Sequence, residues 1–147
     1  MNIVKLDYNP DTDSIEVFLA GCNIRCKGCH NAGLWSFDRG QEWRSMQGLL
    51  AHPNVPRVMV MGGEPLDQDM GQLCAMLEYL QEHYSEVWVF TGHDYVHPAV
   101  VDMVDYMKCG HYIEGSNPES WTHPDGFIIT LASSNQFIIK GDRARAD

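Results

Sequence analysis

Three short apolar runs, each followed directly by a glycine-containing turn, constrain the fold of this chain more than any other feature. The runs cover residues 15–20, 58–61 and 87–90, and they lead to Gly21, Gly62-Gly63 and Thr91-Gly92. Runs of this length match strands rather than helices. The first run alternates at Glu16 and then becomes wholly apolar, as expected for a strand that enters a buried sheet. Because parallel strands end at the same edge of a sheet, we expect the three glycine turns to lie together.

The segment between the second and third runs has the period of an amphipathic helix. Its apolar positions are Met70, Leu73, Cys74, Leu77 and Leu80. This spacing is close to 3.6 residues, and Asp67 or Asp69 is the expected N-cap. A weaker helix is expected over residues 97–108, with an inner face formed by Val100, Val101, Val104 and Met107.

The remaining pattern predicts an α/β fold. Further short strands are expected around residues 112–113, 127–129 and 137–139, and residues 115–126 are expected to form an ordered loop. The 147 residues are too few for a complete barrel of roughly 250 residues, so we expect one domain over residues 1–147. This domain is predicted to be a partial (β/α) barrel of about five or six mostly parallel strands.

The charge of the chain limits its partners. A formal charge of −10 disfavours the phosphate backbone of nucleic acids. The chain contains no run of ~20 apolar residues, and residues 1–10 lack the basic-then-apolar order of a secretion signal. We therefore expect no membrane span and a cytoplasmic location. Arg25, Lys27, Arg39 and Arg44 lie in the near-neutral first fifty residues, where an anionic partner would approach.

Three of the five cysteines, Cys22, Cys26 and Cys29, lie within eight residues. Without an export signal, clustered thiols are more often metal ligands or redox groups than disulfides. Three thiolates from one loop suit zinc or an iron-sulfur cluster, and they leave a metal position open for chemistry. A structural zinc site completed by a histidine is the alternative. Cys74 and Cys109 are expected to be buried as small hydrophobic residues.

The second motif is the turn Gly62-Gly63-Glu64-Pro65. Two glycines allow the backbone to approach a ligand without interference from Cβ atoms, Glu64 adds an anionic acceptor, and Pro65 stiffens the exit from the turn. Most turns of this kind simply join a strand to a helix. The meaning of this turn therefore depends on the cysteines.

Together the two motifs resemble those of the radical S-adenosylmethionine enzymes. Residues 21–31 and Trp35, followed by the Gly-Gly-Glu-Pro turn, are most similar to the activating enzymes of glycyl-radical proteins. Within that group, the anaerobic ribonucleotide reductase activating enzyme family is the best match. Further similarity lies in residues 89–92, 108–113 and 133–136.

The resemblance implies a set of site residues. Cys22, Cys26 and Cys29 would bind three irons of a 4Fe-4S cluster, and the fourth iron would chelate the amino and carboxylate groups of S-adenosylmethionine. The methionyl ammonium would contact Gly62, Gly63 and Glu64. Further contacts would come from Thr91, to the carboxylate or ribose, and from Gly28 and His30, to the adenine.

The resemblance also implies an activity and partners. The reduced cluster would cleave S-adenosylmethionine, and the resulting 5′-deoxyadenosyl radical would create a glycyl radical on anaerobic ribonucleoside-triphosphate reductase. Flavodoxin or ferredoxin would supply the electron. Because a partial barrel cannot enclose a radical, we expect the protein substrate to cover the open side. The alternatives are activation of a pyruvate formate-lyase type enzyme, a small-molecule enzyme such as a deazapurine synthase, and a non-catalytic iron-sulfur or zinc module.

Overall fold

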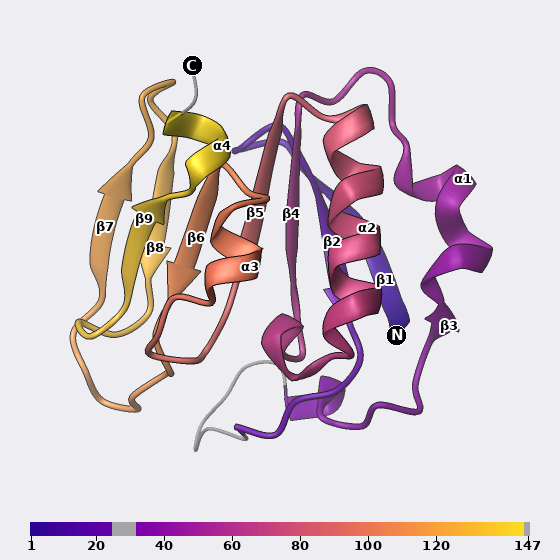
Figure 1. The fold of residues 1–147 in the computed structure, drawn as a ribbon. Helices are drawn as coiled ribbons and strands as arrows, with labels where there is room; N and C mark the ends of the chain where they lie inside the picture. Colours follow the sequence, from indigo (N-terminus) through magenta and orange to yellow (C-terminus); the bar gives the residue numbers. More distant parts are fainter. Residues whose placement is uncertain (25–31, 146–147) are drawn as a thin grey trace.

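The computed structural model describes residues 1–24 and 32–145 (Figure 1). Its larger sheet contains β1 (Asn2–Asn9), β2 (Ser14–Leu19), β3 (Gln41–Glu42), β4 (Arg57–Gly62), β5 (Glu86–Phe90), β6 (Tyr106–Cys109) and β9 (Phe137–Lys140). The smaller sheet is the hairpin of β7 (Glu119–Thr122) and β8 (Ile128–Leu131). The helices are α1 (Gln47–Leu50), α2 (Met70–His83), α3 (Pro98–Val101) and α4 (Asp142–Arg145). Short 3-10 turns cover Ala32–Leu34, Trp43–Met46 and Pro65–Asp67.

The strand order of the larger sheet is β3-β1-β2-β4-β5-β6-β9. The four strands β2, β4, β5 and β6 are parallel, whereas β1, β3 and β9 pair antiparallel at the two edges. The predicted α/β class with a mostly parallel centre is therefore confirmed. The predicted count of five or six strands is wrong, because the sheet has seven strands, and a partial barrel is not confirmed.

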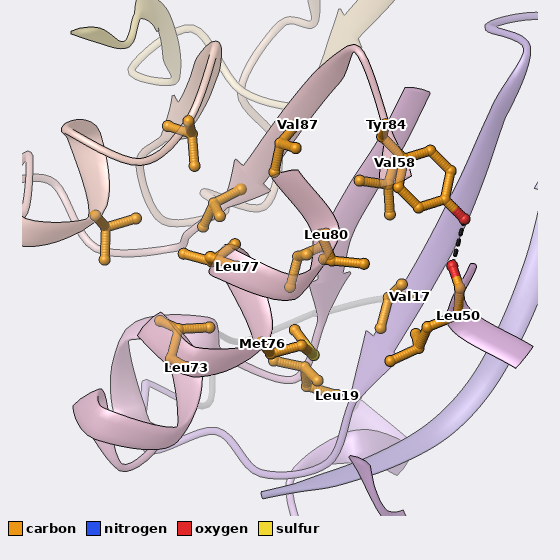
Figure 2. Packing of buried hydrophobic residues seen from close by; sticks show 14 of the residues in the cluster. Val17, Leu19, Leu50, Val58, Leu73, Met76, Leu77, Leu80, Tyr84 and Val87 are labelled. Atoms are coloured by element: carbon orange, nitrogen blue, oxygen red, sulfur yellow. Dashed lines mark hydrogen bonds between the residues drawn. The ribbon is translucent and has the colours of Figure 1, made fainter. Parts of the chain in front are cut away.

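Helix α2 packs on one face of the parallel strands and forms the main core. Figure 2 shows Leu73, Met76, Leu77 and Leu80 of α2 against Val17, Leu19, Val58 and Val87 of the sheet, all of them buried. Asp69 accepts a hydrogen bond from the Gln72 amide at 2.9 Å, which confirms it as the N-cap. Burial of each large side chain contributes about 1.5–3 kcal/mol, so this face holds the helix in place.

The opposite face of the sheet is covered by the β7–β8 hairpin. Met59, Trp88 and Tyr106 point to this side and pack with Ile129 of β8. The Trp121 ring of β7 meets the Trp88 ring edge-on, with centroids 5.4 Å apart. These contacts involve Met59, Trp88 and Tyr106, which lie before the last two residues of β4, β5 and β6, and no residue of the hairpin lines the cavity at the carboxyl ends of these strands.

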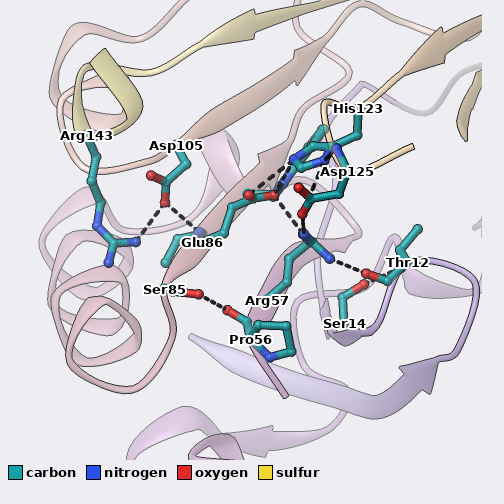
Figure 3. A network of polar contacts seen from close by, with 12 residues as sticks. Thr12, Ser14, Pro56, Arg57, Ser85, Glu86, Asp105, His123, Asp125 and Arg143 are labelled. Carbon is teal, nitrogen blue, oxygen red and sulfur yellow. Dashed lines mark hydrogen bonds and ion pairs between the residues drawn. The ribbon is translucent and has the colours of Figure 1, made fainter. Parts of the chain in front are cut away.

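A buried polar network lies where the parallel strands begin (Figure 3). Arg57, at the start of β4, donates to Glu86 of β5 at 2.7 Å and to Asp125 in the hairpin turn at 3.1 Å. It also donates to the Thr12 carbonyl. His123 is 3.0 Å from Glu86 and stacks on the Phe127 ring. The network therefore links the hairpin to the main sheet.

The structure corrects the prediction for the chain after β5. The helix expected over residues 97–108 ends at Val101, and residues 106–109 form β6 instead. On β6, Met107 and Cys109 both point into the core on the α2 side. Met107 is therefore buried as the next turn of a helix would predict, although it lies on a strand. The strand expected at residues 112–113 is absent from the described structure, and the expected loop over 115–126 contains β7. None of the described helices has the length and apolar character needed to cross a membrane.

Candidate functional site

The carboxyl ends of the parallel strands surround a cavity of about 180 Å³. Its lining residues are Cys22, Ile24, Met61, Gly62, Gly63, Glu64, Phe90, Thr91, Gly92, Lys108, Gly110, Tyr112 and Gln136. The structure thus brings the glycine turns after β4 and β5 to one place, beside the first cysteine of the cluster motif. Residues from four strand ends share one small space, which is the arrangement typical of a ligand site in an open α/β sheet.

Gly62 and Gly63 fit closely against the segment that precedes Cys22. The Gly63 amide donates to the Leu19 carbonyl at 2.8 Å, and the Glu64 amide donates to the Gly21 carbonyl at 2.6 Å. A Cβ atom on Gly63 would lie 2.3 Å from the Gly21 carbonyl oxygen. Gly62 has a φ of 104°, a conformation that favours glycine. The two glycines are therefore required by backbone packing as well as by access for a ligand.

Glu64 joins the ends of β4 and β5. Its carboxylate is buried, with the residue 1% exposed, and it accepts from the Leu66 amide, the Thr91 hydroxyl and the Gly92 amide at 2.8, 2.7 and 2.6 Å. Burial raises the pKa of Glu64, and these three hydrogen bonds together with the nearby His93 offset part of that rise. A carboxylate has about four acceptor positions, so about one is left for a ligand.

Asp67 and His93 form a second link that sequence reasoning missed. Asp67 accepts from the Asn23 amide at 2.7 Å, and its other oxygen is 2.8 Å from Nε2 of His93. The His93 amide in turn donates to the Thr91 hydroxyl at 3.0 Å. The residue after Cys22 is therefore tied to the turns that follow β4 and β5. The sequence indicated these two residues only by their position, because Asp67 and His93 both follow predicted strands.

Lys108 of β6 is another cavity residue that the sequence did not single out for its chemistry. Its ammonium lies 5.1 Å from the centroid of the Phe90 ring, and burial lowers the pKa of Lys108. Beyond it, Gln136 donates to the Gly110 carbonyl at 3.1 Å and accepts from the Ala132 amide at 2.8 Å. The cavity wall on this side is therefore cationic and held in place.

Ser133 and Asn135 fasten the loop that follows β6. Ser133 donates to the His111 carbonyl at 3.3 Å and accepts from the Ile113 amide at the same distance. The side-chain amide of Asn135 donates to the same carbonyl at 2.9 Å. These two residues position the rim of the cavity and do not line it.

The other predicted site residues are distributed as follows. Cys26, Cys29, Gly28 and His30 lie outside the described residues, whereas Cys22 is buried in the cavity wall. Within residues 1–24 and 32–145, three or more His, Cys, Asp or Glu side chains nowhere gather as a metal site.

The two remaining cysteines lie in or next to the hydrophobic core. Cys109 belongs to the main core cluster, and its burial raises the pKa of the thiol to about 11. Its predicted burial is confirmed. Cys74 is only half-buried, on α2. A soft thiolate ligand at Cys22, beside a glycine-lined cavity, fits an iron-sulfur cluster with a ligand at its open position.

Comparison with known proteins agrees with this chemistry. The 4Fe-4S single cluster domain family matches residues 14–139. The anaerobic ribonucleoside-triphosphate reductase-activating protein of Salmonella typhimurium is 26% identical over 137 residues, which cover 83% of this chain and 84% of the relative. The protein of the same name from Escherichia coli K12 is 25% identical with the same coverage. The one from Enterobacteria phage T4 is 22% identical over 76% of this chain and 85% of its own length.

Proposed function

The chain belongs to the 4Fe-4S single cluster domain family, and from this membership we propose that it is a radical S-adenosylmethionine activating enzyme that creates a glycyl radical on anaerobic ribonucleoside-triphosphate reductase. The observation that carries the proposal is the shared cavity of Cys22, the Gly62-Gly63-Glu64 turn and Thr91. Relatives similar over most of both chains bear the name of that activity.

The proposed ligand set follows from the positions of the cavity residues. Cys22, Cys26 and Cys29 hold the cluster, which when bound and reduced supplies the electron for cleavage of S-adenosylmethionine. The backbone of Gly62 and Gly63 approaches the methionyl ammonium, and the remaining acceptor position of Glu64 faces the same charge. Thr91 borders the carboxylate or ribose, and Gly28 and His30 flank the adenine.

The protein substrate covers the open end of the cavity in this proposal. Exposed apolar side chains lie on the loops after β5 and β6, namely Tyr95, which is 52% exposed, and Ile113, which is 42% exposed. A partner surface over these loops would exclude water from the reacting groups while its glycine-bearing loop enters the cavity. We place the enzyme in the cytoplasm, where thiols stay reduced and flavodoxin or ferredoxin would supply the electron.

The test is an anaerobic activation assay. The reconstituted, reduced protein is mixed with S-adenosylmethionine and the anaerobic ribonucleotide reductase from the same source. We expect a stable glycyl radical, seen as a doublet in electron paramagnetic resonance, together with 5′-deoxyadenosine in about equal amount. Cleavage without a glycyl radical on any glycyl-radical protein of that source would contradict the activating role. Absence of cleavage would contradict the enzyme assignment altogether.

A further inference from the structure

Lys108 points into the cavity from the face of the sheet opposite α2. On β6, the flanking residues Met107 and Cys109 both join the core on the α2 side. Lys108 alternates to the other face, where its ammonium lies over the Phe90 ring of the neighbouring strand. The side chain is half-buried and lines the same cavity as Cys22 and Glu64.

The half-buried ammonium of Lys108 has no counter-ion among the described residues, in contrast to the buried Arg57 and the half-buried Arg143. Arg57 pairs with Glu86, and Arg143 pairs with Asp105, each at 2.7 Å. Within residues 1–24 and 32–145, the side-chain ammonium of Lys108 has neither an ion-pair partner nor a hydrogen-bond partner, and its one described contact is with the Phe90 ring. Holding an ammonium away from water without a partner is unfavourable. Burial accordingly lowers the pKa of Lys108, and no neighbouring carboxylate opposes the effect.

The charges of the described cavity lining match one end of the proposed ligand. Glu64, at the end of β4, supplies a carboxylate with about one free acceptor position, and Lys108, on β6, supplies the ammonium. Thr91 and Gly92 of the strand between them contribute no charge. The methionyl end of S-adenosylmethionine carries one ammonium and one carboxylate on the same carbon. A zwitterion of this kind would satisfy both side chains at once.

We propose that Lys108 binds the methionyl carboxylate of S-adenosylmethionine while Glu64 faces the methionyl ammonium, an assignment that rests on the proposed function. The ion pair gives the Lys108 ammonium a counter-ion, which none of the other described residues provides. It also sets the orientation of the amino-acid end, because exchange of the two groups would place like charges together. Lys108 is thus a specificity residue for the carboxylate.

The experiment compares two ligands in two variants. The oxidised holoprotein, in which no cleavage occurs, is titrated anaerobically with S-adenosylmethionine and with decarboxylated S-adenosylmethionine. We expect Lys108→Met to weaken binding of the first ligand about ten- to hundredfold, the size of a charge-assisted hydrogen bond, and to leave the second unchanged. Lys140→Met, on the neighbouring strand β9 and exposed, is the matched control and should alter neither affinity. Lys108→Arg keeps the charge and should retain most of the discrimination.

Decarboxylation also removes a group that can chelate iron, so it weakens binding in every variant. The effect of Lys108 is the difference between the variants in the ratio of the two affinities. Iron content and the thermal midpoint of each sample show whether the variant is folded and loaded. An equal loss for both ligands, or no loss for either, would overturn the assignment of Lys108 while the proposed function stands. Failure of the wild-type holoprotein to bind S-adenosylmethionine would reject the proposed function, and the assignment with it.

Discussion

At the scale of single residues, the site depends on the missing Cβ atom of Gly63 as well as on the side chains around the cavity. Gly63 leaves room for the Gly21 carbonyl, which accepts from the Glu64 amide and precedes Cys22. The turn therefore holds Gly21, the residue before Cys22, and also lines the cavity. A substitution there acts on both.

We expect Gly63→Ala to weaken binding of S-adenosylmethionine and to lower the free energy of unfolding by about 1–3 kcal/mol, because the added Cβ would overlap the Gly21 carbonyl. Gly48→Ala is the control, since a Cβ at that helix position would meet nothing within 4 Å. Urea denaturation and a binding titration on samples of known iron content measure both effects. Equal behaviour of the two variants would show that the turn is only a connection.

The cysteines provide the second prediction at this scale. Cys22→Ala, Cys26→Ala and Cys29→Ala should each abolish cluster assembly, because three thiolates are the minimum set of protein ligands. Cys74→Ala and Cys109→Ala should keep the brown absorbance after anaerobic reconstitution, since the first lies on α2 and the second in the hydrophobic core. Loss of the cluster in either of these, with retention in one of the first three, would refute the ligand assignment.

At the scale of elements, β6 places Lys108 in the cavity wall, and Asp105 anchors the chain directly before β6. The Asp105 carboxylate accepts from the Val87 amide of β5 and from Arg143 of α4, both at 2.7 Å. Burial raises the pKa of Asp105, and the Val87 hydrogen bond and the Arg143 charge oppose this rise. The C-terminal helix therefore helps to hold the strand that carries Lys108.

Removal of Arg143, the cationic partner of Asp105, should make the free energy of unfolding more dependent on pH. A carboxyl whose pKa is raised on folding binds its proton more strongly in the folded state, so its stabilising contribution falls as pH rises above the unfolded value. Arg143→Met raises the pKa of Asp105 further. Loss of the hydrogen bonds from Arg143 to the Gln81 and Tyr84 carbonyls lowers stability at every pH. We expect the deficit relative to wild type to grow by about a further 1–2 kcal/mol between pH 4 and pH 7.

Urea denaturation across this pH range measures the difference. The double variant Arg143→Met/Asp105→Asn is the control, because a neutral amide can still accept from the Val87 amide and has no charge to bury. Its stability relative to the single variant Asp105→Asn should change little between pH 4 and pH 7, because neither protein has a carboxyl at this position. A deficit of Arg143→Met that is constant with pH would show that packing, and not charge, accounts for the contact.

At the scale of the whole molecule, the two faces of the sheet have different coverings. Helix α2 covers one face with apolar side chains, whereas the β7–β8 hairpin covers the first half of the other and is tied down by polar groups (Figure 3). Arg57 is the centre of this network, because it contacts Glu86, Asp125 and the Thr12 carbonyl. The carboxyl half of the same face stays open as the cavity.

We expect Arg57→Met to destabilise the protein by about 1.5–3 kcal/mol, because it removes the charged hydrogen bonds to Glu86, Asp125 and the Thr12 carbonyl. Hydrogen exchange should accelerate first in residues 119–131, where the hairpin loses its link. Lys5→Met is the control, since its ion pair with Asp7 is exposed and should be worth less than ~1 kcal/mol. Uniform acceleration over the whole sheet would contradict the role of Arg57 as a hairpin anchor.

The sequence by itself determined the parallel centre of the sheet, helix α2 with a cap at Asp67 or Asp69, and the meeting of Cys22 with the glycine turns. Each of these follows from local periodicity, or from the rule that parallel strands end at one edge. β1 escaped prediction because polar and apolar residues alternate along most of it, without a continuous apolar run.

Only the tertiary structure decided whether some segments form a helix or a strand. The apolar spacing from Val100 to Met107 fits a helix, and only pairing with β5 makes residues 106–109 a strand. Asp67, His93 and Lys108 gained their roles in the same way, because their partners lie on turns or strands distant in sequence. Period and strand order are local properties of the chain, whereas the neighbour of a charged side chain across a sheet is set by the packing of the whole domain.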